Sequence, residues 1–184
     1  PYTLFNFVKV FPYESISYTK WKVIRELHFA DSTKIALQFK TRFWEKLGYF
    51  GGKLTTDLPI KFSYFPSHVD SESGVILASY TWEDDAQIWD HMKNNDRIDQ
   101  ALEYLSVIFG DIVFKEFLVG YSHSWTRYPF SGGAFVMYKP YQQKEFGKYT
   151  RTPEGRIHFG GSHASSTPGW IQGAIEAGIR TAFE

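Results

Sequence analysis

Apolar residues near the start of the chain follow two different periods. Every third residue is apolar within 18–29, which is the spacing of one face of a short helix. The period then shortens to two within 32–44, which predicts a half-buried strand with Lys34 at its entrance. The apolar positions are Trp21, Ile24 and Leu27 in the first pattern and Ile35, Leu37 and Phe39 in the second.

The middle of the chain predicts further strands and two helices. Glycine and proline interrupt 46–67 around one short strand, and 74–82 is a compact apolar run. Residues 83–95 and 97–110 have helical spacing. Asp84 and Asp85 complement the dipole at the start of the first helix, and Gly110 ends the second helix.

Strand-like segments resume at 112–125 and 132–142, and a strand, a glycine pair, a Ser/Thr/Pro loop and a helix follow between Gly155 and Arg180. Neither a repeat nor a low-complexity tract interrupts this order. The fold class predicted is α/β or α+β, with a mixed, mainly antiparallel sheet flanked by helices.

The last helix is predicted to be buried. Ile171, Ile175 and Ile179 form one stripe, and a stripe of small residues runs beside it. Gly173 and Gly178 each cost about 1 kcal/mol of helix propensity relative to Ala, which close packing would offset.

At the start of this helix, "TPGW" leaves backbone N–H groups at the positive end of the dipole. In the simpler interpretation, Ser166 or Thr167 caps these donors. In the alternative, they hold an anion or an electron-rich heterocycle, with Trp170 beside it.

Composition narrows the function classes. The 184 residues suffice for one domain of ordinary size, and 20 basic residues balance 20 acidic ones, so no overall field favours nucleic acid or an anionic membrane. Cysteine is absent, which excludes thiol chemistry but leaves the compartment open. No apolar run is long enough to cross a bilayer, and the start without Met leads us to expect a fragment of a longer protein.

Two other chemistries fit the residues poorly. "GGSHA" approximates the nucleophile elbow of hydrolases at Ser162, but Pro168 and Gly169 delay the helix and no histidine follows His163. The remaining histidines form no cluster with metal-ligand spacing, and we expect no metal site. They are His28, His68, His91, His123 and His158.

The segment "GRIHFGGSHASSTPGWIQGAIEAGIRTA" resembles the carboxyl-terminal signature of flavin-dependent amine oxidases, in particular the L-amino-acid oxidases. "STKIALQFKTRFWEKLGYFGGKLTTDLP", "YTWEDDA" and "GGAFVMYKPYQ" resemble other family segments in the same order. Several separated matches are far more specific than one glycine motif. The resemblance covers most of the chain.

The resemblance implies a set of site residues. Lys34 matches the lysine that holds a water at flavin N5, and Tyr80 matches a tyrosine that binds the substrate carboxylate. Phe135 and the pair Gly169 and Trp170 match residues around the substrate. The positions matching the FAD site are Trp125, Gly161, Ser162, Gly169, Trp170, Ile171, Gln172, Gly173 and Ala174. On the residues alone, Lys34 would be a solvated edge lysine and the aromatic residues would pack a core.

The chain departs from the family pattern at Ser162, where the family usually has a glutamate that reaches the ribityl chain. The resemblance also implies that residues 1–150 belong to a substrate-binding domain and that 151–184 supply the last strand and helix of an FAD-binding domain. The dinucleotide fingerprint and the arginine for the substrate carboxylate are not in this sequence. We therefore expect FAD in the intact protein but poor retention by this chain alone.

The reaction implied is the oxidation of an L-amino acid by dioxygen to a 2-oxo acid, ammonia and hydrogen peroxide, with apolar and aromatic substrates favoured. Three alternatives remain open: oxidation of a primary amine or polyamine, oxidative decarboxylation of an amino acid, and a non-catalytic interaction module derived from the fold. The partners implied are the substrate, dioxygen and the remainder of the same protein, without nucleic acid or membrane. The oligomeric state stays open.

Overall fold

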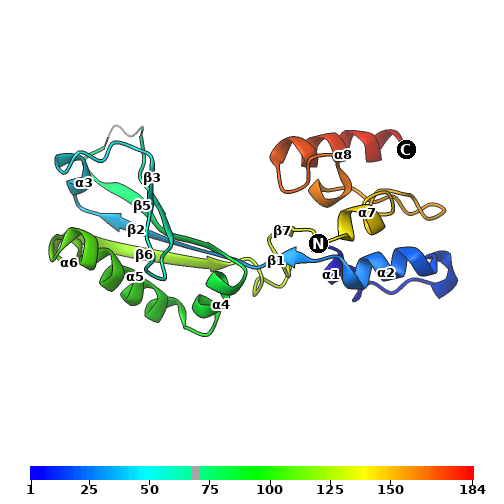
Figure 1. The fold of residues 1–184 in the computed structure, drawn as a ribbon, viewed down its shortest axis with the longest axis horizontal. Helices are drawn as coiled ribbons and strands as arrows, with labels where there is room; N and C mark the ends of the chain where they lie inside the picture. The colour runs from blue at the N-terminus through cyan, green and yellow to red at the C-terminus, as the bar shows by residue number, and fades with distance from the viewer. Residues whose placement is uncertain (68–70) are drawn as a thin grey trace. The chain divides into compact units, whose positions relative to one another are not determined.

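The structure is a computed structural model that describes residues 1–67 and 71–184. Its internal contacts divide the chain into two units, drawn in Figure 1. Unit 1 contains Pro1–Ala30 and Thr126–Glu184, and unit 2 contains Asp31–Trp125. The domain boundary expected between residues 150 and 151 falls inside unit 1. No described helix is long and apolar enough to cross a membrane.

Unit 2 is built on a five-stranded antiparallel sheet with the strand order β3-β4-β5-β2-β6. The long strand β2 lies between β5 and β6, and its burial alternates as the period-two pattern predicts. The strands are β2 (Ser32–Phe39), β3 (Lys53–Thr55), β4 (Phe62–Tyr64), β5 (Gly74–Trp82) and β6 (Phe117–Ser124).

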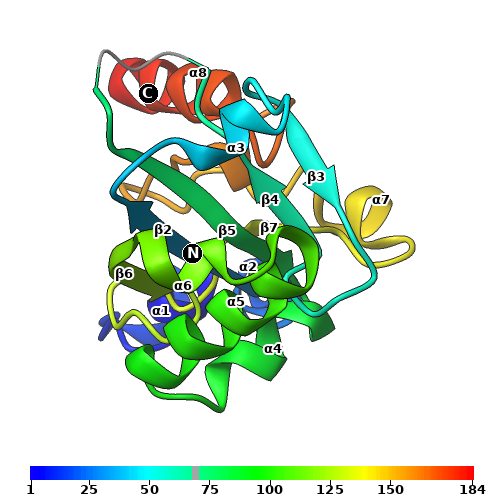
Figure 2. The same cartoon turned by 90° about the vertical axis from the view of Figure 1, so that its left-hand side faces the viewer.

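Helices cover one face of this sheet. Figure 2 shows α4, α5 and α6 together on one side of the strands, and α4 and α5 contact both β2 and β5. Apolar side chains of β2 and β5 pack there against α5, in a core that includes Leu37, Ile76 and Leu105. The helices are α3 (Phe43–Lys46), α4 (Asp84–Asp90), α5 (Asn94–Phe109) and α6 (Ile112–Glu116). The antiparallel sheet flanked by helices confirms the predicted fold class.

The opposite face of the sheet, which we call the open face, carries the alternate residues of the same strands. In β2 these are Lys34, Ala36 and Gln38, each only partly buried. Their partners in β6 are His123, Tyr121 and Val119. Tyr121 and Val119 are exposed, so this part of the open face is packed less tightly than the face under α5.

Unit 1 joins short elements from both ends of the chain. The two-stranded sheet pairs β1 with β7, and Tyr2, Val23 and Phe159 lie in its apolar core. The elements are α1 (Tyr2–Phe5), η1 (Tyr13–Ser15), α2 (Tyr18–Glu26), β1 (Phe29–Ala30), β7 (Phe135–Val136), α7 (Gln142–Phe146), η2 (Ser162–Ala164) and α8 (Ile171–Phe183). The first and last helices predicted from spacing, α2 and α8, are confirmed.

Three of the predicted strand segments are wrong in part. Within 132–142, only Phe135 and Val136 form a strand, and Gln142 begins α7. The segment predicted to be a strand before the glycine pair forms only one bridge, between Glu154 and Ile157, because no described segment supplies a ladder for residues 156–159. In 112–125, the first five residues form α6 instead of a strand, and β6 begins at Phe117.

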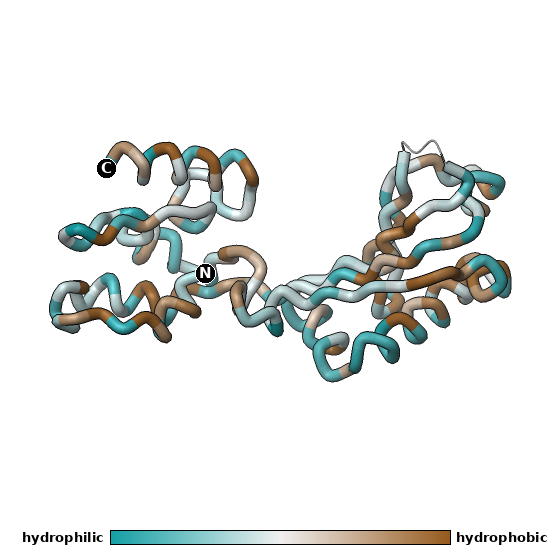
Figure 3. The backbone as a smooth tube through the Cα atoms, turned by 180° about the vertical axis from the view of Figure 1, so that it is seen from behind, coloured by the Kyte–Doolittle hydropathy of each residue, from teal (hydrophilic) through white to brown (hydrophobic). Residues whose placement is uncertain are grey.

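The prediction that the last helix is buried is also wrong within this chain. The stripe of Ile171, Ile175 and Ile179 is exposed at 78%, 58% and 56%, whereas the buried residues of α8 are Gly173 and Ala177. Figure 3 shows apolar positions recurring along the helix that ends at the C-terminus. The helix therefore packs by its small residues and leaves its isoleucines uncovered.

Candidate functional site

Lys34 and Tyr80 form the centre of the candidate site in unit 2. They are directly opposed across β2 and β5, and the Lys34 ammonium nitrogen lies 4.5 Å from the centre of the Tyr80 ring. An ammonium over an aromatic face is attracted by the negative face of the ring. The sequence singled out both residues, and the structure brings them together.

Trp125 follows directly after β6 and is hydrogen-bonded to the first residue of β2. Its backbone N–H donates to the carbonyl oxygen of Ser32 at 2.9 Å, and its side chain remains 38% exposed. Trp82 is the cross-strand partner of Ser32 on the other side. The predicted flavin-side aromatic residue therefore occupies the row next to Lys34.

Sequence reasoning missed His123. It is the β6 partner of Lys34, and its ring lies 4.5 Å from the Trp125 ring in an edge-to-face arrangement. Its position two residues before Trp125 in an alternating strand was the available signal, since both residues then face the same side. The row Tyr80, Lys34 and His123 runs across three strands of the open face.

The second group of predicted residues lies in unit 1. Gly169 has φ +83°, and a Cβ built on it would lie 3.6 Å from the Phe135 ring. Trp170 directly precedes α8 as its N-cap residue and is 69% exposed. Gly169 and Phe135 are therefore neighbours, as the proposed substrate wall requires, with Trp170 next in sequence.

Backbone donors at the start of α8 suit an electron-rich ligand. Trp170 is the N-cap residue and makes no side-chain capping bond, so the capping predicted for Ser166 or Thr167 is wrong. Ser166 instead donates from its hydroxyl to the Glu176 carboxylate at 2.8 Å. The Trp170 side chain thus caps none of the first-turn N–H groups, and uncapped donors at a helix start can hold an anion or an electron-rich heterocycle.

Gly173 allows the loop before α8 to lie directly on the helix. A Cβ at this position would be 2.2 Å from the Thr167 carbonyl oxygen and 2.3 Å from the Ser165 hydroxyl. The predicted close packing at Gly173 is therefore confirmed. Around Gly178 a Cβ would meet no atom within 4 Å, so packing in this chain gives no reason for that glycine. Ala174 follows Gly173 on the exposed side of the helix.

The His163 ring packs against the glycine loop that contains Ser162. Gly161 has φ +124°, and a Cβ there would lie 3.0 Å from the His163 ring. That ring packs edge-to-face on Tyr2 and Phe29, at 4.5 and 5.7 Å between ring centres. Burial, reinforced by the positive charge of Lys20, lowers the pKa of His163 to about 4. The imidazole is therefore neutral at pH 7 and serves as packing.

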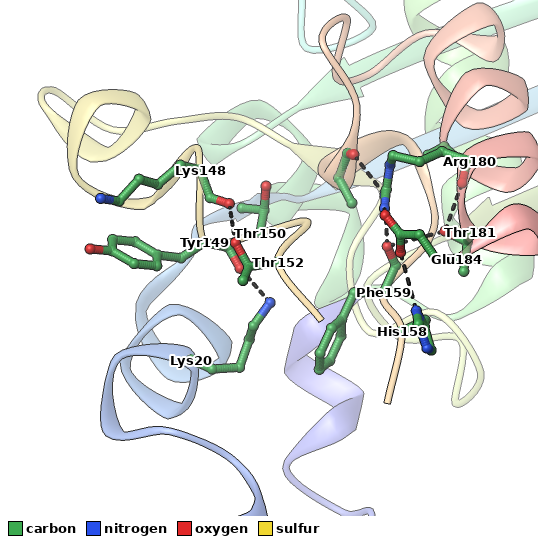
Figure 4. Close-up of polar contacts among 12 residues, drawn as sticks. Lys20, Lys148, Tyr149, Thr150, Thr152, His158, Phe159, Arg180, Thr181 and Glu184 are labelled. Atoms are coloured by element: carbon green, nitrogen blue, oxygen red, sulfur yellow. Dashed lines mark hydrogen bonds and ion pairs between the residues drawn. The ribbon is translucent and has the colours of Figure 1, made fainter. Parts of the chain in front are cut away.

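Polar contacts hold both ends of this loop to α8 (Figure 4). Arg180 donates to the carbonyl oxygens of Phe159 at 2.9 Å and Ala164 at 3.3 Å, and it also pairs with Glu184. The Glu184 carboxylate contacts His158 at 3.2 Å. The position of Ser162 thus depends on the last turns of the chain.

A buried lysine supports the same region from α2. Lys20 is 1% exposed, donates to the Tyr149 carbonyl oxygen and has its ammonium nitrogen 3.8 Å from the centre of the Phe159 ring. Burial lowers the pKa of this lysine to about 8. Among the described residues, no three or more metal-binding side chains gather in one place. His68 lies outside the described residues.

Unit 2 carries a lysine and a tyrosine on the open face of an antiparallel sheet, and unit 1 separately carries a glycine loop and a helix start without a side-chain cap. Residues 6–184 match the family model for flavin containing amine oxidoreductase. The chain belongs to this family.

Curated relatives include L-amino-acid oxidases. The chain is 54% identical, over its whole length, to a Bacillus subtilis protein named "Putative L-amino-acid oxidase YobN", and spans 39% of that protein. It is 39% identical to an L-amino-acid oxidase of Siganus canaliculatus over 91% of this chain and 32% of the relative. The chain thus spans less than half the length of these two relatives.

Solved structures show the same fold. A putrescine oxidase bound to putrescine matches all of this chain and 40% of its own, with a TM-score of 0.83 and 19% identity. Cyclohexylamine oxidase from Brevibacterium oxydans matches 91% of this chain and 37% of its own, with a TM-score of 0.77 and 20% identity. At such identities the likeness concerns the fold alone.

Proposed function

We propose that this chain is part of an FAD-dependent L-amino-acid oxidase that converts L-amino acids, dioxygen and water to 2-oxo acids, ammonia and hydrogen peroxide, with hydrolysis of the imino acid releasing the ammonia. The observation that carries the proposal is the opposed pair of Lys34 and Tyr80 on the open face. The names of the curated relatives point to the same activity.

In this proposal, Tyr80 recognises the substrate carboxylate. Its hydroxyl donates a hydrogen bond to the charged group, which is stronger than a bond between neutral partners. Apolar and aromatic L-amino acids are the favoured substrates, because Phe135 and Trp170 supply aromatic walls. Gly169 brings its backbone close to the substrate amino group.

Lys34 acts through a water molecule. The ammonium group holds this water at a fixed place on the open face, so that it can donate and accept protons near the reacting atoms. The Tyr80 ring orients the lysine by the contact described above. Trp125 excludes bulk water from the adjoining side.

The donors of unit 1 fit a flavin. The start of α8 would hold the pyrimidine edge through Ile171, Gln172 and Gly173, while Gly161 and Ser162 would contact the ribityl chain. When bound, FAD accepts hydride from the substrate Cα and passes the electrons to dioxygen. In this assignment residues 1–150 belong to the substrate-binding domain and 151–184 to the FAD-binding domain.

The test is anaerobic mixing of the full-length flavoprotein with an L-amino acid and, separately, with the amine that lacks its carboxylate. We expect L-phenylalanine or L-leucine to bleach the flavin absorbance and phenethylamine or isopentylamine to leave it largely unchanged. Bleaching by the amines alone would assign the protein to amine oxidation. A full-length protein that binds no flavin would favour the non-catalytic module.

A further inference from the structure

His123 has a position on the open face that the proposed reaction has not yet used. It lies opposite Lys34 in the β2–β6 register, as Tyr80 does in the β2–β5 register. Side chains directly opposed in antiparallel strands have Cβ atoms roughly 4.5–5.5 Å apart. The lysine therefore has an aromatic neighbour on each side.

The His123 ring also contacts the indole of Trp125. Their ring centres are 4.5 Å apart with an interplanar angle of 75°, the edge-to-face geometry that aromatic pairs favour. Tyr121 lies on the other side of His123 along the strand, at 6.5 Å and nearly parallel. The histidine is thus held within an aromatic row and touches one flavin-side residue directly.

We propose that His123 is a positioning residue of the oxidase, which fixes the orientation of the Trp125 indole and confines the Lys34 side chain from the β6 side. The inference rests on the proposed function. It requires the ring, because edge-to-face packing and steric confinement both depend on its shape. Lys34 then has one direction left open, away from the sheet and toward the reacting atoms.

A neutral aromatic ring meets this requirement better than a cation. A second positive charge opposite Lys34 would repel the ammonium group and disfavour its charged state. Phenylalanine at this position should therefore preserve the role, alanine should abolish it, and lysine should be worse than alanine. This order separates ring packing from any role in proton transfer.

The experiment compares His123→Ala, His123→Phe and His123→Lys in the full-length flavoprotein. Val119→Ala is the matched control, since Val119 is on the same strand and face, is exposed and pairs with Gln38. Rapid anaerobic mixing measures flavin reduction and substrate Kd. The fluorine NMR signal of Trp125, in apoprotein labelled with fluorotryptophan and assigned by Trp125→Phe, reports the indole environment without flavin.

We expect His123→Ala to slow flavin reduction about tenfold with less than about a twofold change in Kd, since misplacement affects orientation more than binding. The Trp125 signal should shift in the same variant. His123→Phe should restore both properties, and His123→Lys should be slower than His123→Ala.

Unchanged reduction and an unchanged Trp125 signal in His123→Ala would overturn the inference, as would a phenylalanine variant no better than alanine. If L-amino acids do not reduce the wild-type flavin, the proposed function fails. The fluorine signal still decides whether His123 orients Trp125.

Discussion

The Lys34 ammonium group and the Tyr80 ring face each other 4.5 Å apart across β2 and β5. Two side chains in such contact depend on each other, so the effects of replacing them should not add. A double-mutant cycle on flavin reduction should show a smaller combined loss than the sum of the single losses. The following predictions use the full-length protein unless stated otherwise.

Lys34→Met should slow flavin reduction or reoxidation far more than it weakens substrate binding, because the ammonium group is proposed to act through water. Stopped-flow measurement of the two half-reactions gives both rates, and titration gives Kd. Lys53→Met is the matched control: its ammonium nitrogen lies 3.5 Å from the centre of the Phe62 ring on a neighbouring strand. Equal effects of the two substitutions would remove Lys34 from the site.

Tyr80→Phe should worsen kcat/KM for L-amino acids by about one to two powers of ten, because a hydrogen bond to a charged group is worth roughly 1.5–3 kcal/mol. An amine without a carboxylate should respond little. Tyr64→Phe serves as the control, since its ring lies 6.3 Å from that of Tyr80. The carboxylate role fails if L-amino acids are oxidised by Tyr80→Phe as efficiently as by the wild type.

In the 184-residue chain, His163 should make the free energy of unfolding depend on pH. Because burial lowers its pKa from 6.5 to about 4, the folded state binds fewer protons than the unfolded state between these values. The free energy of unfolding should therefore fall as the pH drops through this window, by on the order of 3 kcal/mol in total. His163→Phe should flatten this dependence in urea unfolding.

His91→Gln replaces an exposed histidine and leaves His163 in place, so it should keep the wild-type slope. A slope equally steep in His163→Phe would show that other groups carry the acid sensitivity.

Alanine at the two helical glycines should have opposite effects on the 184-residue chain. Gly178→Ala should raise the free energy of unfolding by about 1 kcal/mol, because it gains helix propensity in open space. Gly173→Ala gains the same propensity but places a Cβ 2.2 Å from a backbone oxygen, so it should destabilise. Thermal unfolding of both variants tests the close packing, which would be refuted by equal stabilisation.

Periodicity predicted the elements whose partners are local or whose pattern is strict. The alternation of Ile35, Leu37 and Phe39 identified β2, and the helical spacing after residue 96 identified α5, because each buries a regular face. The prediction of a strand before Gly160 was wrong because that segment has no neighbouring strand, among the residues that the structure describes, with which to pair. A strand needs a neighbour, and sequence spacing says nothing about whether one is present.

The candidate site was predictable as far as the family motifs reached. They contain Lys34 and Tyr80, and the wider resemblance added Trp125, but the contact between the first two depends on a register across about forty-five positions, shifted by a bulge after Ile35. His123 belongs to no quoted motif and became visible only through the β2–β6 pairing. The exposure of the α8 isoleucines could not be predicted from the sequence either. An apolar stripe indicates that a helix face packs against something, but it does not identify the segment that covers the face.

The division into two units also determines which part of the chain can fold first during synthesis. Unit 2 is one uninterrupted stretch, so all five strands of its sheet have left the ribosome once residue 125 has emerged, and it can fold while translation continues. Unit 1 must wait: Tyr2 donates its hydroxyl hydrogen to the carbonyl oxygen of Thr150, and its ring contacts Phe159 and His163. Residues 1–30 therefore remain without these partners until residues 150–163 have been made.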